Sequence, residues 1–237
     1  MNKLFYRIIF NQARGLLMVV ADITRSHRAG VSPSSDPDNK TPAELTARLS
    51  PLALGLLLTF GWITPVTAGV VADRSAPGNQ QPQITHSASG TMQVNIQTPS
   101  TGGVSRNTYS QFDVDNHGAI LNNSHSNTQT RLGGMVAANP NLAKGEATVI
   151  LNEVNSRDPS QLKGYIEVAG QKAQVVIANP SGISCDGCGF INANRATLTT
   201  GTPQFSHDNL TGYRVNGGEI TITGSGLDSS AQDYTDI

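Results

Sequence analysis

Short apolar runs rich in Val, Ile and Thr recur along the chain, and each ends at Gly, Asn, Asp or Pro. Runs of this kind are typical of β-strands, whereas the 3.6-residue periodicity of an amphipathic helix is nearly absent. We therefore predict an all-β protein. The expected strands cover residues 91–96, 147–154, 165–169, 174–178, 196–199 and 219–223.

Short strands separated by turn residues fit a sandwich, a barrel or a β-solenoid. Three features favour the solenoid. Runs such as VVIA and TVIL are partly apolar on both faces, Asn is frequent at strand ends, and aromatic residues make up only 5% of the chain. A narrow coil interior suits Val, Ile, Leu and Ala, and stacked Asn side chains can satisfy backbone groups at the corners. Because no capping segment follows the last strand, we expect the N-terminal part of a longer protein.

The first 68 residues have the pattern of a secretory leader. Lys3, Arg7 and Arg14 lie among apolar residues, and an uncharged stretch runs from Ser50 to Gly69. A basic segment, an apolar core and a small-residue site are typical of a secretory signal. This leader is unusually long, since about 48 residues precede its apolar core.

The apolar core of the leader, Leu52–Ile63, is shorter than the roughly 20 residues that a membrane span needs. Pro65 and the small-residue site VTA follow it. We therefore expect residues 1–68 to be removed by cleavage between Ala68 and Gly69. Cleavage after Ala72 and retention as an uncleaved anchor are the alternatives.

Residues 69–237 are long enough to form one domain with its own core. The leader contains 7 of the 16 Lys/Arg and 4 of the 17 Asp/Glu, which leaves 9 basic and 13 acidic residues and a net charge of −4. Because a nucleic-acid partner would require a basic face, we expect no nucleic-acid partner.

The chain has two cysteines, Cys185 and Cys188, spaced C-x-x-C. A zinc site normally needs four ligands, and the five His residues show no metal-binding spacing. A thioredoxin-like centre would need a βαβ context, which is missing. Because export leads to an oxidising compartment, we predict a disulfide that closes a tight turn, and no metal site. Two unpaired buried thiols are the alternative.

Two related Asn-Pro segments interrupt the pattern of expected strands. In such segments the Asn side chain can bind the backbone of its own turn, and a following Gly can adopt positive φ. On this chemistry alone, both segments are turns between strands. The first contains Asn139, Pro140, Asn141 and Leu142, and the second contains Asn179, Pro180, Ser181, Gly182 and Ile183.

Catalytic patterns are sparse. Ser181 does not lie in a G-x-S-x-G elbow, and nothing marks Asp113 and Asp115 as an acid–base pair. The segment DVDNHG is too short for an EF-hand calcium loop, and no Gly-rich phosphate loop is present. We therefore predict no catalytic residues, no cofactor and no enzymatic activity.

Taken together, these segments resemble the secretion domain of two-partner secretion exoproteins, a family that includes filamentous haemagglutinins, secreted haemolysins and contact-dependent inhibition proteins. The resemblance covers nearly the whole chain. Residues 1–26 resemble the family's extended signal peptide, and YSQFDVDNHGAILNNS resembles its early strand segment. NPNL and NPSGI match its two hallmark motifs, with Ser181 where Asn is common. The stretch ILNEVNSRDPSQLKGYIEVAGQKAQVVIANP is most similar to contact-dependent inhibition proteins.

The resemblance implies a right-handed parallel β-helix with an N-terminal strand cap and hairpins outside the helix. It implies export by the general secretory machinery of a Gram-negative bacterium. POTRA domains of an outer-membrane transporter would then capture the chain in the periplasm, and the two Asn-Pro motifs would form the recognition site. The domain would fold outside the cell, on the cell surface or in the medium, and nucleate a long stem. Any adhesive, lytic or toxic activity would lie further along, although a truncated or split gene product also fits.

Two other function classes compete with a secretion-targeting and folding-nucleating domain. A polysaccharide-degrading β-helix enzyme should show clusters of charged residues on one face, which the sequence lacks. A free-standing adhesin or carbohydrate-binding domain would not need both Asn-Pro motifs together with the extended leader. We therefore expect the secretion domain.

Overall fold

The computed structural model describes residues 6–11, 16–21 and 69–237 of the chain. The chain divides into two units, residues 1–63 and 64–237. In the first unit, β1 (Tyr6–Asn11) pairs with β2 (Leu16–Ala21) as an antiparallel hairpin. The apolar core of the leader and Ala68 lie outside the described residues, and Gly69 is the first described residue of the second unit.

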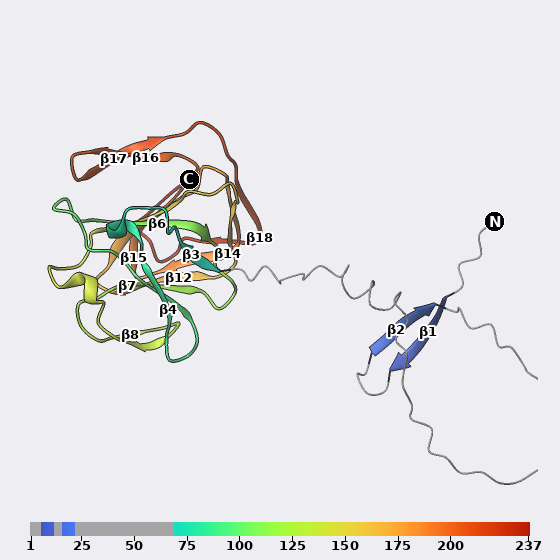
Figure 1. The fold of residues 1–237 in the computed structure, drawn as a ribbon. Helices are drawn as coiled ribbons and strands as arrows, with labels where there is room; N and C mark the ends of the chain where they lie inside the picture. Colours follow the sequence, from blue (N-terminus) through green and yellow to red (C-terminus); the bar gives the residue numbers. More distant parts are fainter. Residues whose placement is uncertain (1–5, 12–15, 22–68) are drawn as a thin grey trace, which may run out of the picture. The chain divides into compact units, whose positions relative to one another are not determined.

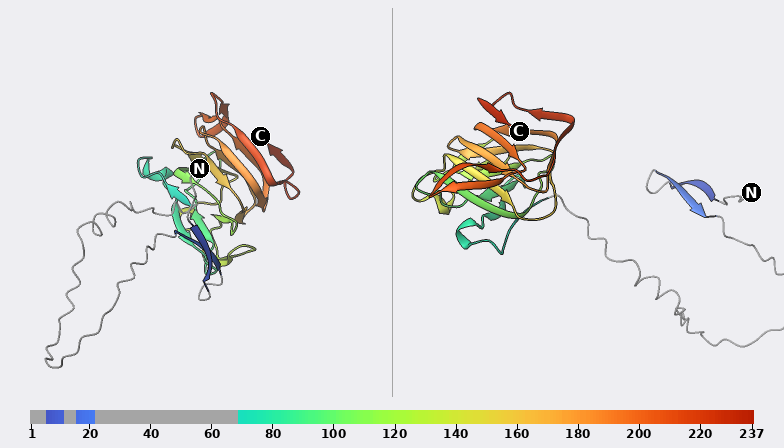
Figure 2. Two further views of the ribbon diagram at one scale, coloured as in Figure 1. Left: turned by 90° about the vertical axis from the view of Figure 1, so that its right-hand side faces the viewer. Right: turned by 90° about the horizontal axis from the view of Figure 1, so that it is seen from above.

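The second unit contains two sheets whose strands stack on one another (Figures 1 and 2). The first sheet has the order β19-β15-β13-β10-β6-β3. Its strands are β3 (Val70–Ala72), β6 (Val104–Phe112), β10 (Val149–Val154), β13 (Ala173–Ala178), β15 (Ala193–Thr199) and β19 (Tyr234–Asp236).

The second sheet has the order β11-β14-β12-β7-β5-β4, and β18 also pairs with β14. Its strands are β4 (Gln83–His86), β5 (Met92–Asn95), β7 (Ala119–Asn123), β11 (Ser160–Leu162), β12 (Tyr165–Gly170), β14 (Ile183–Ile191) and β18 (Ile220–Asp228). Among the described residues the helical segments are two 3-10 turns, η1 (Gly78–Gln80) and η2 (Pro140–Leu142).

The chain passes back and forth between the two sheets, so each coil adds a strand to both. Pairs such as β6 with β10, β10 with β13, and β13 with β15 are all parallel. We name each coil after its strand in the first sheet: the β6, β10, β13 and β15 coils. At the N-terminal end, β3 pairs antiparallel with β6 and β4 pairs antiparallel with β5, which forms a strand cap.

Two antiparallel hairpins lie outside the stacked coils. The first joins β8 (Thr128–Thr130) to β9 (Gly134–Val136), and the second joins β16 (Thr202–Ser206) to β17 (Asn209–Arg214). The predicted fold class is therefore confirmed: an all-β parallel β-helix with a strand cap and hairpins outside the helix.

Apolar side chains that point between the two sheets form the main core. They include Val94, Leu121, Ile150, Ile166, Val175, Ile177 and Leu198, all fully buried. Near the cap, the rings of Tyr109 and Phe112 meet edge to face with centroids 4.9 Å apart. Small aliphatic side chains fill most of the interior, as the low aromatic content indicates.

Stacked Asn side chains bond neighbouring coils, both near the strand ends, where the sequence predicts them, and inside the strands. Asn95 in β5 and Asn122 in β7 are in register, and Asn122 Nδ2 donates to Asn95 Oδ1 at 2.9 Å. Asn107 in β6 and Asn152 in β10 are also in register, and Asn107 Nδ2 donates to the carbonyl of Leu151 at 3.3 Å. These bonds join one coil to the next without requiring a repeat in the sequence.

Candidate functional site

The NPNL motif is a turn whose polar groups are satisfied within the domain. Asn139 caps η2, and its Oδ1 accepts a hydrogen bond from the backbone amide of Asn141 at 3.0 Å. Asn139 Nδ2 donates to the carbonyls of Asn122 at 2.8 Å and Ile96 at 3.0 Å. Leu142 is fully buried in the core. The motif therefore ties the corner before β10 to β5 and β7.

The NPSGI motif repeats this arrangement at another corner. Asn179 Oδ1 accepts from the backbone amide of Ser181 at 2.9 Å, and its Nδ2 donates to Ser160 Oγ and the carbonyl of Asp158, both at 3.0 Å. The backbone amide of Gly182 closes the turn on the carbonyl of Asn179 at 3.0 Å. Gly182 adopts a φ of 122°, as the sequence predicts, and Ile183 begins β14.

Both Asn side chains are shielded from solvent in the folded domain. Asn139 is 2% exposed and Asn179 is 0% exposed, whereas Pro140 and Pro180 are exposed. The first motif packs against the ends of β5 and β7, and the second against Asp158 and the start of β11, so they occupy separate corners. A partner that reads either Asn side chain must therefore meet the chain before the domain folds.

Cys185 and Cys188 form a disulfide, with Cα atoms 5.4 Å apart. The prediction of a tight turn is wrong, because both cysteines lie within β14. In a regular strand, residues three apart point to opposite faces. Gly187, with a φ of 78°, lies in a bulge that turns both sulfurs into the core.

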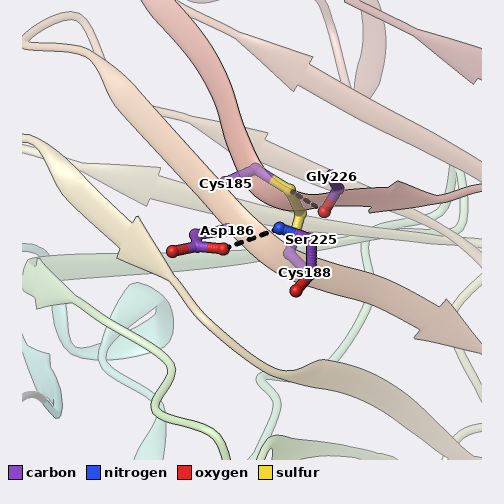
Figure 3. The surroundings of a disulfide bond; sticks show 5 residues. All are labelled: Cys185, Asp186, Cys188, Ser225 and Gly226. Carbon is purple, nitrogen blue, oxygen red and sulfur yellow. Dashed lines mark hydrogen bonds between the residues drawn. A yellow bond between two sulfur atoms is a disulfide. The ribbon is translucent and has the colours of Figure 1, made fainter.

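The strand on the next coil, β18, is also irregular at this place. Asp186 aligns with Thr223 and Cys188 with Leu227, so the short irregularity in β14 faces the longer segment Gly224–Gly226 in β18. Figure 3 shows Asp186 Oδ1 accepting from the backbone amide of Ser225 at 3.0 Å.

In the same view, Cys185 Sγ lies 3.3 Å from the carbonyl oxygen of Gly226 (Figure 3). This is a close contact without a proton, because a disulfide sulfur has none to donate. The disulfide thus shapes the backbone of two neighbouring coils.

A network of polar side chains fastens β18 beyond the bulge. Asp228 accepts from Ser230 Oγ at 2.7 Å, from the Ser230 amide at 3.0 Å and from Tyr165 Oη at 2.7 Å. The bonds from Ser230, with a smaller contribution from Tyr165, lower the pKa of Asp228 to about 2. The Tyr165 ring reaches across β14 over Gly189, where any Cβ would lie 2.5 Å from the ring.

The described residues hold no cluster of three or more His, Cys, Asp or Glu that could bind a metal ion. Grooves of about 490 and 610 Å³ flank the β16–β17 hairpin. In the smaller one, Arg195 Nε donates to Asp236 Oδ2 at 2.5 Å, and this bond lowers the pKa of Asp236. Within the described part of the chain, no helix is both long and apolar enough to span a membrane.

The residues that support the Asn-Pro motifs were not identified from the sequence. They lie 17–43 positions from Asn139 and 19–21 positions from Asn179. Only the coil geometry brings such distant segments together. The frequent Asn and Ser residues near strand ends were the available signal, but they did not identify individual pairs.

Comparison with known proteins assigns both parts of the chain. A family model described as the TPS secretion domain matches residues 68–237. A second, described as the extended signal peptide of the type V secretion system, matches residues 1–59.

Two curated relatives match the whole chain. "Toxin CdiA" of Yersinia pestis is 66% identical over 100% of this chain and 7% of that protein. "tRNA nuclease CdiA-2" of Burkholderia pseudomallei (strain 1026b) is 46% identical over 100% of this chain and 8% of that protein. The chain thus spans only a small part of these relatives.

Among solved structures, the filamentous hemagglutinin secretion domain is similar to this chain. It aligns with a TM-score of 0.64 and 38% identity, over 70% of this chain and 54% of that chain.

Proposed function

Because the chain belongs to the TPS secretion domain family, the domain in which two-partner secretion exoproteins carry their targeting information, we propose that an outer-membrane transporter recognises residues 69–237 before they fold. The match of the secretion-domain model to residues 68–237 carries this proposal. The match of the extended signal peptide to residues 1–59 supports export of the chain through the periplasm of a Gram-negative bacterium.

The Asn-Pro motifs are the proposed recognition site. In the folded domain, the side-chain groups of Asn139 and Asn179 are turned inward and bonded. In an extended chain the same groups are free, and strand addition to periplasmic POTRA domains would expose them to the partner. The transporter therefore reads these residues first, and folding outside the cell then buries them.

The domain itself acts in targeting and in nucleating the β-helix, not in catalysis. One relative is named a tRNA nuclease, and the region that matches this chain makes up only 8% of that protein's length. The family match supports the secretion role over a free-standing adhesin. General secretory export, removal of residues 1–68 and arrival at the cell surface are parts of the same proposal.

The proposal is tested by producing the full chain in a Gram-negative host with and without a two-partner secretion transporter. Immunoblots of medium and periplasm measure where the chain accumulates. We expect release to the medium only with the transporter, and periplasmic retention without it. Equal release in both strains would contradict the proposal.

A further inference from the structure

We infer that the β16–β17 hairpin, residues 202–214, is a strap that couples the β15 coil to the β6 coil and makes the stacked coils unfold as one unit. The hairpin follows β15 in the chain, yet its tip lies against the loop that precedes β6. In the first sheet, β10 and β13 separate β6 from β15. The strap therefore spans the β10 and β13 coils to reach the β6 coil.

The tip of the strap is bonded to the β6 coil. Ser100 Oγ donates to the backbone carbonyl of Asp208 at 2.9 Å, and Thr101 Oγ1 donates to Asp208 Oδ2 at 2.7 Å. These bonds join residues 108 and 107 positions apart. Gly102 lies so close that an added Cβ would be 2.4 Å from Asn209 Oδ1 and 2.7 Å from the carbonyl of Asp208.

The body of the strap covers the outer face of the first sheet (Figure 1). The Arg106 guanidinium lies 4.9 Å from the centroid of the Phe205 ring, and it also pairs with Glu153 of β10 at 2.8 Å. Three strap side chains pack on a small apolar cluster drawn from β6, β10 and β13. The strap contributes Phe205, Leu210 and Tyr213, and the sheet contributes Val104, Val149, Leu151, Val176 and Ala178.

These contacts change how the stacked coils are expected to unfold. In a simple solenoid each coil touches only its neighbours, so stability is a sum of local terms and the ends can open separately. A contact between the β6 and β15 coils removes that independence, because opening either coil breaks the strap's tip. The structure thus predicts equal resistance to opening in the β6 and β15 coils.

Gly102 offers a clean probe of the strap. Its φ lies outside the left-handed region, so Gly102→Ala adds a wedge under the tip without straining its own backbone. Gly212→Ala is the matched control, because Gly212 lies in β17 and an added Cβ there would meet nothing within 4 Å.

Hydrogen exchange of the full chain tests the proposal by comparing the protection factors of amides in β6 and β15. We expect equal protection factors in the wild type and in Gly212→Ala. In Gly102→Ala we expect β15 and the strap to lose about tenfold in protection relative to β6. Should Gly102→Ala fail to fold, Thr101→Val replaces the donating hydroxyl by a methyl group of similar size, and it should lower the protection of β15 relative to β6 in the same direction. Unequal protection in the wild type, or no separation in the folded tip variant, would overturn the inference.

Discussion

Asn179 donates from Nδ2 to the hydroxyl of Ser160 at 3.0 Å, and both residues are buried in the folded domain. This bond places a hallmark residue of the motif inside a corner of the β-helix. Asn179 can therefore have two roles. It closes a turn in the folded protein, and it presents a free amide while the chain is extended.

We predict Gly69 at the N-terminus of the exported protein. The carbonyl of Gly69 accepts from the Asp113 amide at 3.0 Å, and Val70 is buried in β3. Cleavage after Ala72 would remove β3 from the edge of the first sheet and lose this burial. Mass spectrometry of secreted material decides between the sites. A terminus at Asp73 or an intact Met1 would contradict the prediction.

Removal of the disulfide should destabilise the domain modestly and loosen β18 locally. Closing so short a loop stabilises by roughly 2 kcal/mol in the chain-entropy model. The double variant Cys185→Ala/Cys188→Ala should lower the free energy of unfolding by about that amount, measured in urea. Hydrogen exchange should rise first in Gly224–Gly226, the segment of β18 that faces the bulge.

Thiol labelling of the secreted, unfolded and unreduced protein provides the chemical check on the same pair. We expect no reactive thiol and no bound zinc, because both sulfurs are joined to each other. Stoichiometric zinc or two free thiols would refute the disulfide.

Gly224→Ala should destabilise the domain by about 1–3 kcal/mol. Gly224 has a φ of 54°, and an added Cβ would lie 2.0 Å from Asp186 Oδ1, the acceptor of the Ser225 amide. Gly217→Ala is the control, because its added Cβ meets nothing within 4 Å. Chemical unfolding of both variants checks the difference, and equal stabilities would show that the bulge tolerates a side chain.

Acid should weaken the Asp228 network in a defined range. The pKa of Asp228 falls from 3.8 to about 2 in the folded state, chiefly because of its bonds to Ser230. A folded pKa below the unfolded value stabilises the protein above pH 3.8, and this contribution is lost as the pH falls toward about 2. In Asp228→Asn, the urea midpoint of unfolding should therefore decrease less steeply as the pH falls through this range. An unchanged slope would show that other carboxylates carry the acid response.

Four strands, β5, β10, β12 and β13, appear within two residues of their expected bounds. Each was recognised from alternating or β-branched apolar residues. In contrast, β6 was not expected, because its sequence VSRNTYSQF is mostly polar. Buried Ser105 and Asn107 are satisfied there by bonds within the stack, which no local pattern reveals.

The candidate site shows the same limit. The turns at Asn139 and Asn179 follow from local Asn-Pro chemistry and were predicted correctly. The bulge at Gly187 was not, because C-x-x-C alone does not distinguish a turn from an irregular strand. The strap's contact with Gly102 depends on coil stacking, so a sequence pattern could not indicate it.

The central claim is that the transporter reads the Asn-Pro motifs. The test compares Asn179→Ala and Asn139→Ala with Asn152→Ala, a matched control outside both motifs. Asn152 is also fully buried, and it bonds Tyr109 Oη at 2.9 Å and the Val176 carbonyl at 3.1 Å. Each of the three variants loses the hydrogen bonds of a buried Asn side chain, which should lower its free energy of unfolding by about 1–3 kcal/mol.

The decisive measurement is secretion through a co-expressed transporter, plotted against the unfolding midpoint of each purified variant. We predict that the two motif variants are secreted far less than Asn152→Ala at a comparable midpoint. If all three variants fall on one line of secretion against stability, the motifs are only structural turns and the transporter reads something else.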